Sequence, residues 1–202
     1  TNDKFRGVEG AFDKALEGIR ACKRAGIKVG LRYTITKHNV QDLPGIFDLL
    51  EAEDIPRVCF YHLVYTGRGA AVDDLSHEES RRVVDLIVDR TADFHARGLP
   101  KEILTVDNHC DGPYLYMRLL AEGRADDAAR VMELLKMNGG NSTGHGFGCV
   151  SWDGDVYPDQ FLRHHSLGNV CEKSFSKIWT DSSNDFLMAL KNKKAHVTGK
   201  CV

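Results

Sequence analysis

Two cysteines in the C-terminal part of the chain, Cys149 and Cys201, have the side chain that binds iron–sulfur clusters. Soft thiolate ligands match the iron–sulfur core, so cysteine is its usual protein ligand. Cys149 follows the glycine-rich run 144–148, where missing side chains let a bulky group approach the backbone. A long stretch of chain separates the two thiols, and ordinary buried thiols are the alternative interpretation.

Cys149 also begins a predicted β-hairpin. Apolar and aromatic residues flank Asp153-Gly154, a dipeptide suited to the positive φ of a tight primed turn, and Pro158 ends the second strand. Asp159 follows directly. Its carboxylate either binds iron or belongs to an ordinary surface or capping residue, and the second interpretation is the one we favour.

Polar side chains also gather where three short apolar segments end. The candidate functional residues are Arg32, Thr34 and Asn39 after the first segment, His62, Tyr65 and Arg68 after the second, and His109 after the third. In α/β folds, binding and catalytic residues collect beyond the carboxyl ends of parallel strands. We therefore expect these residues to lie at one edge of a sheet.

Each of these groups has a simpler interpretation. Arg32 fits a half-buried, ion-paired position, and residues 62–69 fit a turn with a surface arginine. Gly67-Arg68-Gly69 is too short for a phosphate-binding loop. A zinc site in 107–111 is disfavoured, because adjacent ligands at positions 109 and 110 suit tetrahedral coordination poorly.

The periodicity of apolar residues predicts the elements that position these side chains. Helices are expected over 8–25, 41–52, 76–97 and, in two pieces, 113–137, with strands over 27–36, 58–63 and 103–106 and a short aromatic helix through 175–179. Ser76 and Glu79 form a capping box at the start of the third helix. Strands that alternate with helices predict parallel βαβ units, and three strands are too few to close a barrel.

Composition excludes several classes of function. The 202 residues carry a net charge of −2 and a pI near 6.5, so nothing favours binding to nucleic acid or to an anionic membrane. No apolar run approaches the roughly 20 residues that span a bilayer. The six cysteines are scattered, which favours thiols or metal ligands of a cytoplasmic protein over disulfides.

The ordered motifs of the C-terminal third resemble a known family. Cys149 with Gly154-Asp155-Val156-Tyr157-Pro158, then Leu167-Gly168-Asn169-Val170, then the Phe175–Trp179 helix and Gly199-Lys200-Cys201 are similar to the SPASM/twitch-like auxiliary domain of radical S-adenosylmethionine (SAM) enzymes. Four phrases are most similar to the heme d1 biosynthesis branch, with heme-pathway decarboxylases next: Asp3–Gly7 with Gly10–Asp13, Gly30–Thr34, His62–Gly69 and Tyr157–Phe161.

This resemblance implies a fold and a division into domains. Residues 1–112 would form the later half of a partial TIM-like (β/α)6 radical SAM barrel, 113–137 a helical bridge, and 138–202 an incomplete α+β auxiliary cluster domain. The Cys-x-x-x-Cys-x-x-Cys motif of such enzymes is absent from the chain and would lie upstream, and further cluster cysteines would follow Cys201. The chain is therefore expected to be a fragment that is inactive alone.

The resemblance also implies ligands for the candidate residues. Arg32, Thr34 and Asn39 would bind SAM, whereas His62, Tyr65, Arg68 and His109 would line the substrate pocket, with His62 and Tyr65 as candidates for catalysis. Cys149 and Cys201, with Asp159 as a further option, would hold an auxiliary [4Fe–4S] cluster. The other partners would be a tetrapyrrole substrate and an electron donor such as flavodoxin or ferredoxin.

The implied function is removal of propionate side chains from a siroheme-derived iron tetrapyrrole in heme d1 biosynthesis. Two alternatives stay open on the sequence. One is another radical SAM/SPASM enzyme, either a heme-pathway decarboxylase or a peptide maturase. The other is a non-catalytic auxiliary module whose thiols are structural.

Overall fold

The computed structural model describes residues 1–66, 69 and 73–198. Its contacts divide the chain into two compact units, Thr1–Leu134 and Leu135–Val202. Arg68 and Cys201, two of the candidate site residues, lie outside the described residues. No helix among the described residues is long and apolar enough to cross a membrane.

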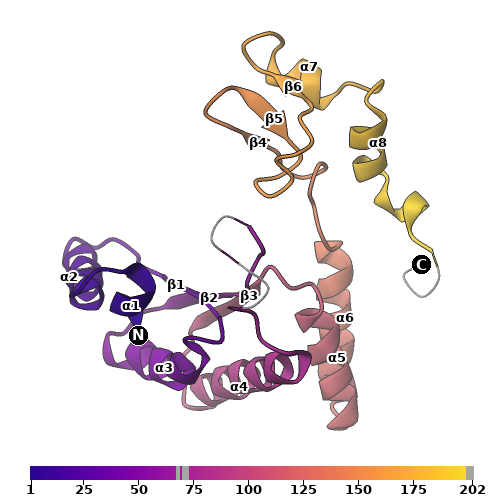
Figure 1. Cartoon of the computed structure of the whole chain (residues 1–202). Coiled ribbons are helices and arrows are strands. Elements are labelled where there is room, and N and C mark those ends of the chain that lie inside the picture. The colour runs from indigo at the N-terminus through magenta and orange to yellow at the C-terminus, as the bar shows by residue number, and fades with distance from the viewer. Residues whose placement is uncertain (67–68, 70–72, 199–202) are drawn as a thin grey trace. The chain divides into compact units, whose positions relative to one another are not determined.

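The first unit contains a parallel sheet with strand order β1-β2-β3 (Figure 1). The strands are β1 (Leu31–Thr34), β2 (Arg57–Tyr61) and β3 (Glu102–Val106), and the long helices are α2 (Ala11–Arg24), α3 (Leu43–Ala52) and α4 (His77–Ala96). Leu31 pairs with Val58, which pairs with Ile103. The predicted βαβ units are therefore confirmed.

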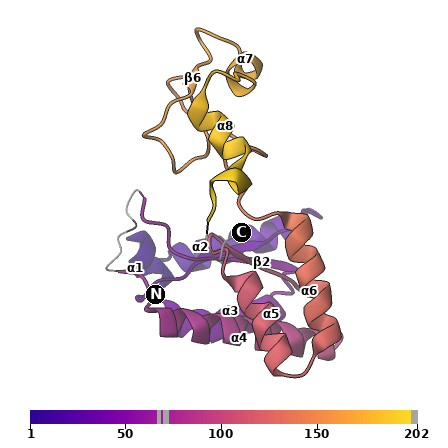
Figure 2. The same ribbon diagram turned by 90° about the vertical axis from the view of Figure 1, so that its right-hand side faces the viewer.

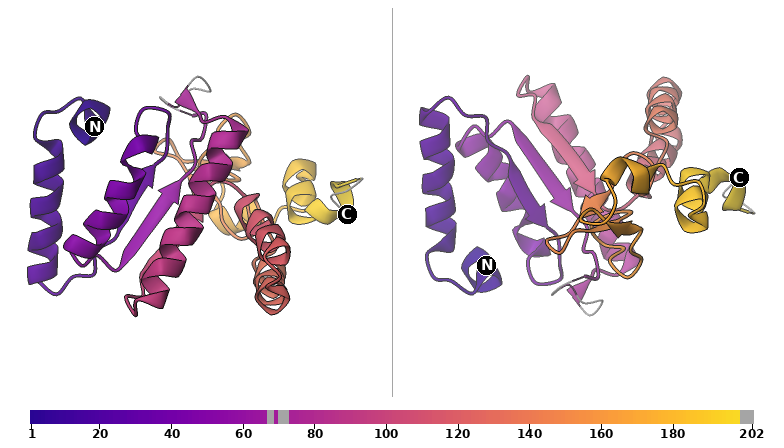
Figure 3. Two further views of the ribbon diagram at one scale, coloured as in Figure 1. Left: turned by 90° about the horizontal axis from the view of Figure 1, so that it is seen from below. Right: turned by 90° about the horizontal axis from the view of Figure 1, so that it is seen from above.

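One face of this sheet packs against α3 and α4 (Figure 3). Val58 and Phe60 of β2 are fully buried there against Phe47 of α3 and Phe94 of α4. Because side chains alternate along a strand, Cys59 and Tyr61 face the opposite side, where they are only half-buried. The helix-covered face therefore supplies the core of the first unit.

The elements differ from the predicted ones mainly at their ends. The first strand covers 31–34 rather than 27–36; β2 begins at Arg57, opposite Gly30, and so offers no partner to residues 27–29. A short helix α1 (Asn2–Arg6) was not predicted. Its Asp3 carboxylate accepts the backbone N–H groups of Gly10 and Phe12 at 2.8 Å, which caps the start of α2. The two helices predicted over 113–137 are α5 (Asp111–Ala121) and α6 (Ala125–Asn138), which run side by side (Figure 2).

The second unit is built on a small antiparallel sheet of β4 (Cys149–Val150), β5 (Asp155–Tyr157) and β6 (Gly168–Asn169). The short helices α7 (Phe175–Trp179) and α8 (Asp185–Lys191) and the 3-10 helix η3 (Lys193–His196) follow. Val156, Ile178 and Leu187 are buried, at 0–2% exposure, and form its core.

The predicted hairpin is present, but its turn is wider than predicted. The Ser151 N–H donates to the Asp155 carbonyl, and the Gly154 N–H donates to the Ser151 carbonyl. Gly154 has φ +89°, so the loop is the three-residue kind that ends in a left-handed glycine bulge. A Cβ at Gly154 would also lie 2.7 Å from the Asn169 side-chain oxygen, which further restricts this position to glycine.

We expect Ser76→Ala to destabilise the first unit by about 1 kcal/mol. The Ser76 hydroxyl accepts the Glu79 N–H at 3.2 Å, and the Glu79 carboxylate accepts the Ser76 N–H at 2.8 Å, so the predicted capping box is confirmed. Denaturant unfolding would measure the loss. Ser76→Thr keeps a hydroxyl that can accept the Glu79 N–H and donate to the Glu79 carboxylate, as Ser76 does at 2.7 Å, and should lose much less. An equal loss in both variants would show that the hydroxyl contributes nothing as a cap.

Candidate functional site

Arg32 leaves the sheet near its carboxyl edge on the face that the helices do not cover. Its guanidinium donates a hydrogen bond to the Tyr61 hydroxyl and lies 4.6 Å from the centre of the Tyr61 ring. The arginine side chain is exposed and makes no ion pair that the structure records among the described residues. Tyr61 therefore orients Arg32 without neutralising its charge.

Asn39 is buried at 6% exposure and holds the bend that follows β1. Its side-chain oxygen accepts the Thr36 N–H at 2.8 Å, and its amide nitrogen donates to the Thr34 carbonyl at 2.8 Å. Both ends of the amide are thus used by the local backbone. Asn39 shapes the loop, and a direct contact with a cofactor stays a prediction.

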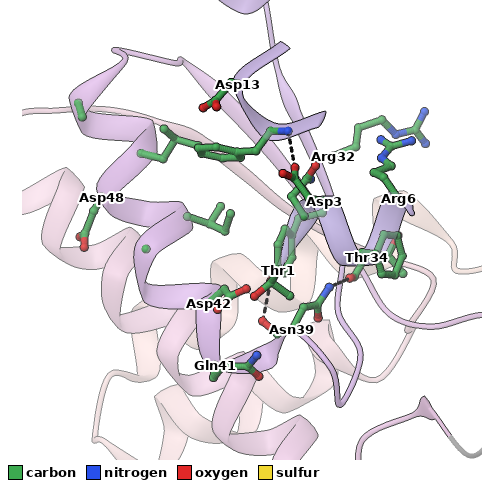
Figure 4. Close-up of a pocket in the computed structure, with 18 residues that line it drawn as sticks. Thr1, Asp3, Arg6, Asp13, Arg32, Thr34, Asn39, Gln41, Asp42 and Asp48 are labelled. Carbon is green, nitrogen blue, oxygen red and sulfur yellow. Dashed lines mark hydrogen bonds between the residues drawn. The ribbon is translucent and has the colours of Figure 1, made fainter. Parts of the chain in front are cut away.

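The first unit has an open cavity of about 1090 Å³ at the β1 edge, lined by Arg32, Thr34 and Asn39 (Figure 4). These are the three residues that the sequence analysis selected after the first strand, and their binding of SAM stays a prediction. Asp3 and Arg6 of the N-terminal helix line the same cavity. Its walls therefore offer a guanidinium for an anionic group and carboxylates for a cationic group.

His62 lies at the end of β2 in a second groove, where it contacts Asp111 of α5. His62 Nε2 lies 2.8 Å from Asp111 Oδ2, and the two side chains are only 14% and 9% exposed. The Asn108 amide nitrogen donates to the other Asp111 oxygen at 2.9 Å. This carboxylate is thus bound on both sides, and it fixes the His62 ring.

Asp107 is the first residue after β3 and has φ +69°, an uncommon conformation for a residue other than glycine. Partial burial raises the pKa of Asp107 above its usual value, although the nearby charges of His62, Arg32 and His109 oppose the shift. Such conformations often occur at binding sites, which makes Asp107 a further candidate.

Replacing Asp107 with asparagine should change how the free energy of unfolding depends on pH. A carboxyl whose pKa is higher in the folded state than in the unfolded state favours folding less as pH rises through that pKa. The asparagine side chain does not ionise, and asparagine tolerates positive φ. The stability of D107N relative to wild type should therefore increase from below pH 3.8 to neutral pH. Unfolding at several pH values measures this, and a pH-independent difference would contradict it.

Tyr65 and His109 are both exposed residues on the loops at this edge. The Tyr65 hydroxyl donates to the Asp74 carboxylate, which raises the pKa of Tyr65 above its usual value. Tyr65 and His62 line the same groove. The structure thus brings together the two predicted catalytic candidates, while His109 is not among the residues that line this groove.

Cys149 lies on β4 of the second unit as a half-buried free thiol. A Cβ on the preceding residue, Gly148, would lie 2.6 Å from the Trp179 ring, so only glycine lets this ring pack beside the cysteine backbone. Trp179 in turn stacks on Phe175, with ring centroids 5.4 Å apart. The aromatic helix predicted from the sequence therefore supports the strand that carries Cys149.

Asp159 is buried at 7% exposure and bound by three donors. Its Oδ1 accepts the N–H groups of Phe161 and Leu162 at 2.7 and 2.8 Å, and its Oδ2 accepts the Thr143 hydroxyl at 2.7 Å. These are the contacts of a capping residue, in line with the interpretation favoured in the sequence analysis. Iron binding by Asp159 stays a prediction with less support than capping.

The donor set of the second unit fits an iron–sulfur cluster only in part. Cys149 offers the right atom in a half-buried position. In the part of the chain that the structure describes, no group of three or more histidine, cysteine or acidic side chains could hold a metal ion. A cluster bound to Cys149 therefore needs ligands from beyond these residues, such as Cys201.

The sequence analysis did not select Tyr61, Asp107 or Asp111. Tyr61 was detectable, because strand alternation places it on the same face as Arg32's neighbour Cys59. Asp107 and Asp111 belong to the polar segment after β3, but no sequence signal separated them from His109. Asp111 contacts His62 from 49 positions away, which only the paired strands reveal.

The class of protein follows from the fold and from matches to known domains. Residues 145–201 match the SPASM iron–sulfur cluster-binding domain. The fold is similar to a solved structure, native anSMEcpe with bound AdoMet, with a TM-score of 0.59 and 17% identity over 92% of this chain and 47% of that one. The chain thus has the mixed α/β fold expected for the C-terminal part of a radical SAM enzyme with a SPASM domain.

Curated relatives narrow the class. The chain is 64% identical over 196 residues to Fe-coproporphyrin III synthase of Methanosarcina barkeri, covering 96% of this chain and 49% of the relative. It is 38% identical to pre-heme d1 synthase of Dinoroseobacter shibae and 28% identical to AdoMet-dependent heme synthase of Nitratidesulfovibrio vulgaris, covering 100% of this chain and 50% and 53% of those relatives. The chain spans about half the length of the curated relatives it matches and is related to radical SAM enzymes of the heme pathway.

Proposed function

We propose that this chain is part of a radical SAM enzyme that modifies the side chains of an iron tetrapyrrole in the heme pathway. The observation that carries this proposal is the 64% identity to Fe-coproporphyrin III synthase, which extends over both units. The polar residues at the carboxyl edge of the sheet support it, because they line two sites of different chemistry.

The product we favour is Fe-coproporphyrin III, formed from a siroheme-derived iron tetrapyrrole. Identity to the synthase of that product is 64%, whereas identity to pre-heme d1 synthase is 38%. Removal of propionates in the heme d1 branch remains the second candidate, favoured by the phrase Tyr157–Phe161. The two candidates share a substrate class and differ in the side chains removed.

The cavity at the β1 edge is the proposed SAM site. SAM carries a carboxylate, an ammonium group and a sulfonium cation, and the cavity offers both a guanidinium and acidic side chains. Arg32, held by Tyr61, would bind the carboxylate through its planar donor fork. Thr34 would contact the same ligand, and Asn39 would hold the loop that follows β1 in place. When bound beside a [4Fe–4S] cluster, SAM supplies a 5′-deoxyadenosyl radical.

The groove lined by α4, α5 and the loops that follow β2 and β3 is the proposed substrate site. His62 would face the substrate with its ring held by Asp111, and Tyr65 would lie at the rim. We include His109 and Arg68 in this site, with Arg68 binding a tetrapyrrole carboxylate through charge-assisted hydrogen bonds. Cys149 and Cys201 would hold an auxiliary [4Fe–4S] cluster, and flavodoxin or ferredoxin would supply electrons.

An anaerobic assay of the full-length parent protein tests the proposal. Purified protein would receive SAM, a chemical reductant and a siroheme-derived iron tetrapyrrole, and mass spectrometry would identify the products. We expect 5′-deoxyadenosine together with Fe-coproporphyrin III. A product with the masses of pre-heme d1 would favour the second candidate. Formation of neither 5′-deoxyadenosine nor a modified tetrapyrrole by a protein with intact clusters would refute the proposal.

A further inference from the structure

The contacts around Asp111 determine which nitrogen of His62 carries a proton. The Asn108 side-chain oxygen accepts the backbone N–H of Cys110 at 3.0 Å. A backbone N–H is always a donor, so this contact fixes the orientation of the Asn108 amide. Its nitrogen must therefore point toward Asp111, where it donates to Oδ1 at 2.9 Å.

The second Asp111 oxygen then faces the histidine ring. An ionised carboxylate only accepts hydrogen bonds, so His62 Nε2, at 2.8 Å, must carry the proton. In the neutral ring this leaves the lone pair on Nδ1. Both side chains are largely buried, so solvent has little opportunity to replace either contact.

We propose that Asp111, held by Asn108, is a positioning residue that keeps the proton of His62 on Nε2 and offers the Nδ1 lone pair to the substrate. The Nδ1 lone pair would bind an electron-pair acceptor on the substrate. This acceptor is either the iron of the tetrapyrrole or an acidic proton. This role rests on the proposed function for its substrate. Histidines that bind metals or accept protons commonly have their other nitrogen fixed by a carboxylate in this way.

The hydrogen-bond chain predicts how two variants change the tautomer. In Asp111→Asn, the Asn108 nitrogen still requires an acceptor, so the new amide must turn its oxygen to Asn108 and its nitrogen to His62. His62 Nε2 must then accept, and the proton moves to Nδ1. In the double variant Asn108→Asp/Asp111→Asn, position 108 becomes an acceptor, so the amide at 111 reverses and its oxygen again accepts from Nε2.

The first experiment reads the tautomer directly, without substrate. Nitrogen NMR of the full-length parent protein labelled in histidine distinguishes a protonated from an unprotonated Nε2, and His62→Gln identifies the signals of residue 62. We expect the proton on Nε2 in wild type and in the double variant, and on Nδ1 in Asp111→Asn. The same tautomer in wild type and folded Asp111→Asn would overturn the proposal.

The second experiment measures the consequence for the substrate. Fe-coproporphyrin III and metal-free coproporphyrin III serve as probes in absorbance titrations, beside turnover of the siroheme-derived substrate. We expect Asp111→Asn to lose about 10–100-fold in affinity or turnover and the double variant to recover most of it. If Asp111→Asn loses affinity for Fe-coproporphyrin III but not for metal-free coproporphyrin III, iron is the acceptor. If Asp111→Asn binds both probes as wild type does but turns over more slowly, the acceptor is a proton.

The outcomes separate this inference from the proposed function. If wild-type protein binds neither probe and turns over no tetrapyrrole, the proposed function fails, while the NMR result still decides the tautomer. If wild type binds and turns over normally, but Asp111→Asn does so equally well, the positioning role is refuted. Failure of the double variant to recover, despite a restored tautomer, refutes it too.

Discussion

Phe47→Ala is expected to lower the free energy of unfolding of the first unit by about 3–5 kcal/mol. Phe47 has no exposed surface, and its ring centroid lies 5.3 Å from that of Phe60 and 6.2 Å from that of Phe94. Truncation to alanine removes a ring of α3 that packs against both the sheet and α4. The cavity would be enclosed by these rigid aromatic rings, which limits collapse around it.

Denaturant unfolding of wild type and variant measures this effect, with Phe5→Ala as the matched control. Phe5 is 47% exposed on α1, so the same chemical change there should alter stability by only about 0.5 kcal/mol. Comparable losses in both variants would mean that Phe47 is not the centre of the core.

The order of elements in the first unit was predictable, because each signal is local. The helical period of apolar residues, the Ser76 capping box and the β-branched strands each depend on neighbours within one or two turns. The bounds of β1 could not be predicted from the sequence of residues 27–36. Strand length depends on where β2 begins, and that is a property of the paired strands rather than of either segment.

The sites were predictable in position but not in contacts. Parallel strands place their carboxyl ends together, so Arg32 and His62 could be expected at one edge. The roles of Asn39 and Asp111 depend on the angles at which loops leave the sheet. Asn39 was assigned to SAM from resemblance, whereas the structure shows its amide bound to the Thr34 carbonyl and the Thr36 N–H.

In the second unit too, the sequence predicted the position of the hairpin but not its contacts. Asp153-Gly154 correctly indicated a turn, but the pairing of Ser151 with Asp155 adds a residue to the loop. The favoured interpretation of Asp159 as a surface or capping residue followed from its position after Pro158, and three donors now occupy that carboxylate. Cys149 differs from Asp159 in exposure, because Cys149 is a half-buried free thiol whereas Asp159 is buried.

Cys149→Ala should remove the iron and acid-labile sulfide of one [4Fe–4S] cluster, about four iron atoms, from the full-length parent protein. Cys149 is the half-buried thiol of β4 within residues 145–201 that match the iron–sulfur cluster-binding domain. Losing one thiolate leaves an iron atom without its anionic ligand, so the cluster should dissociate or become labile. Iron and sulfide analysis of anaerobically reconstituted protein measures the loss.

Cys171→Ala is the matched control, since Cys171 is a free thiol within the same domain match but is exposed on a turn. Its N–H donates to the Asn169 side chain at 2.9 Å, a backbone contact that alanine keeps. Cys171→Ala should therefore retain the full cluster content. If Cys149→Ala retains it as well, Cys149 is not a ligand; if both variants lose it equally, the loss reflects the stability of the unit. Only a loss confined to Cys149→Ala assigns the thiolate to the cluster.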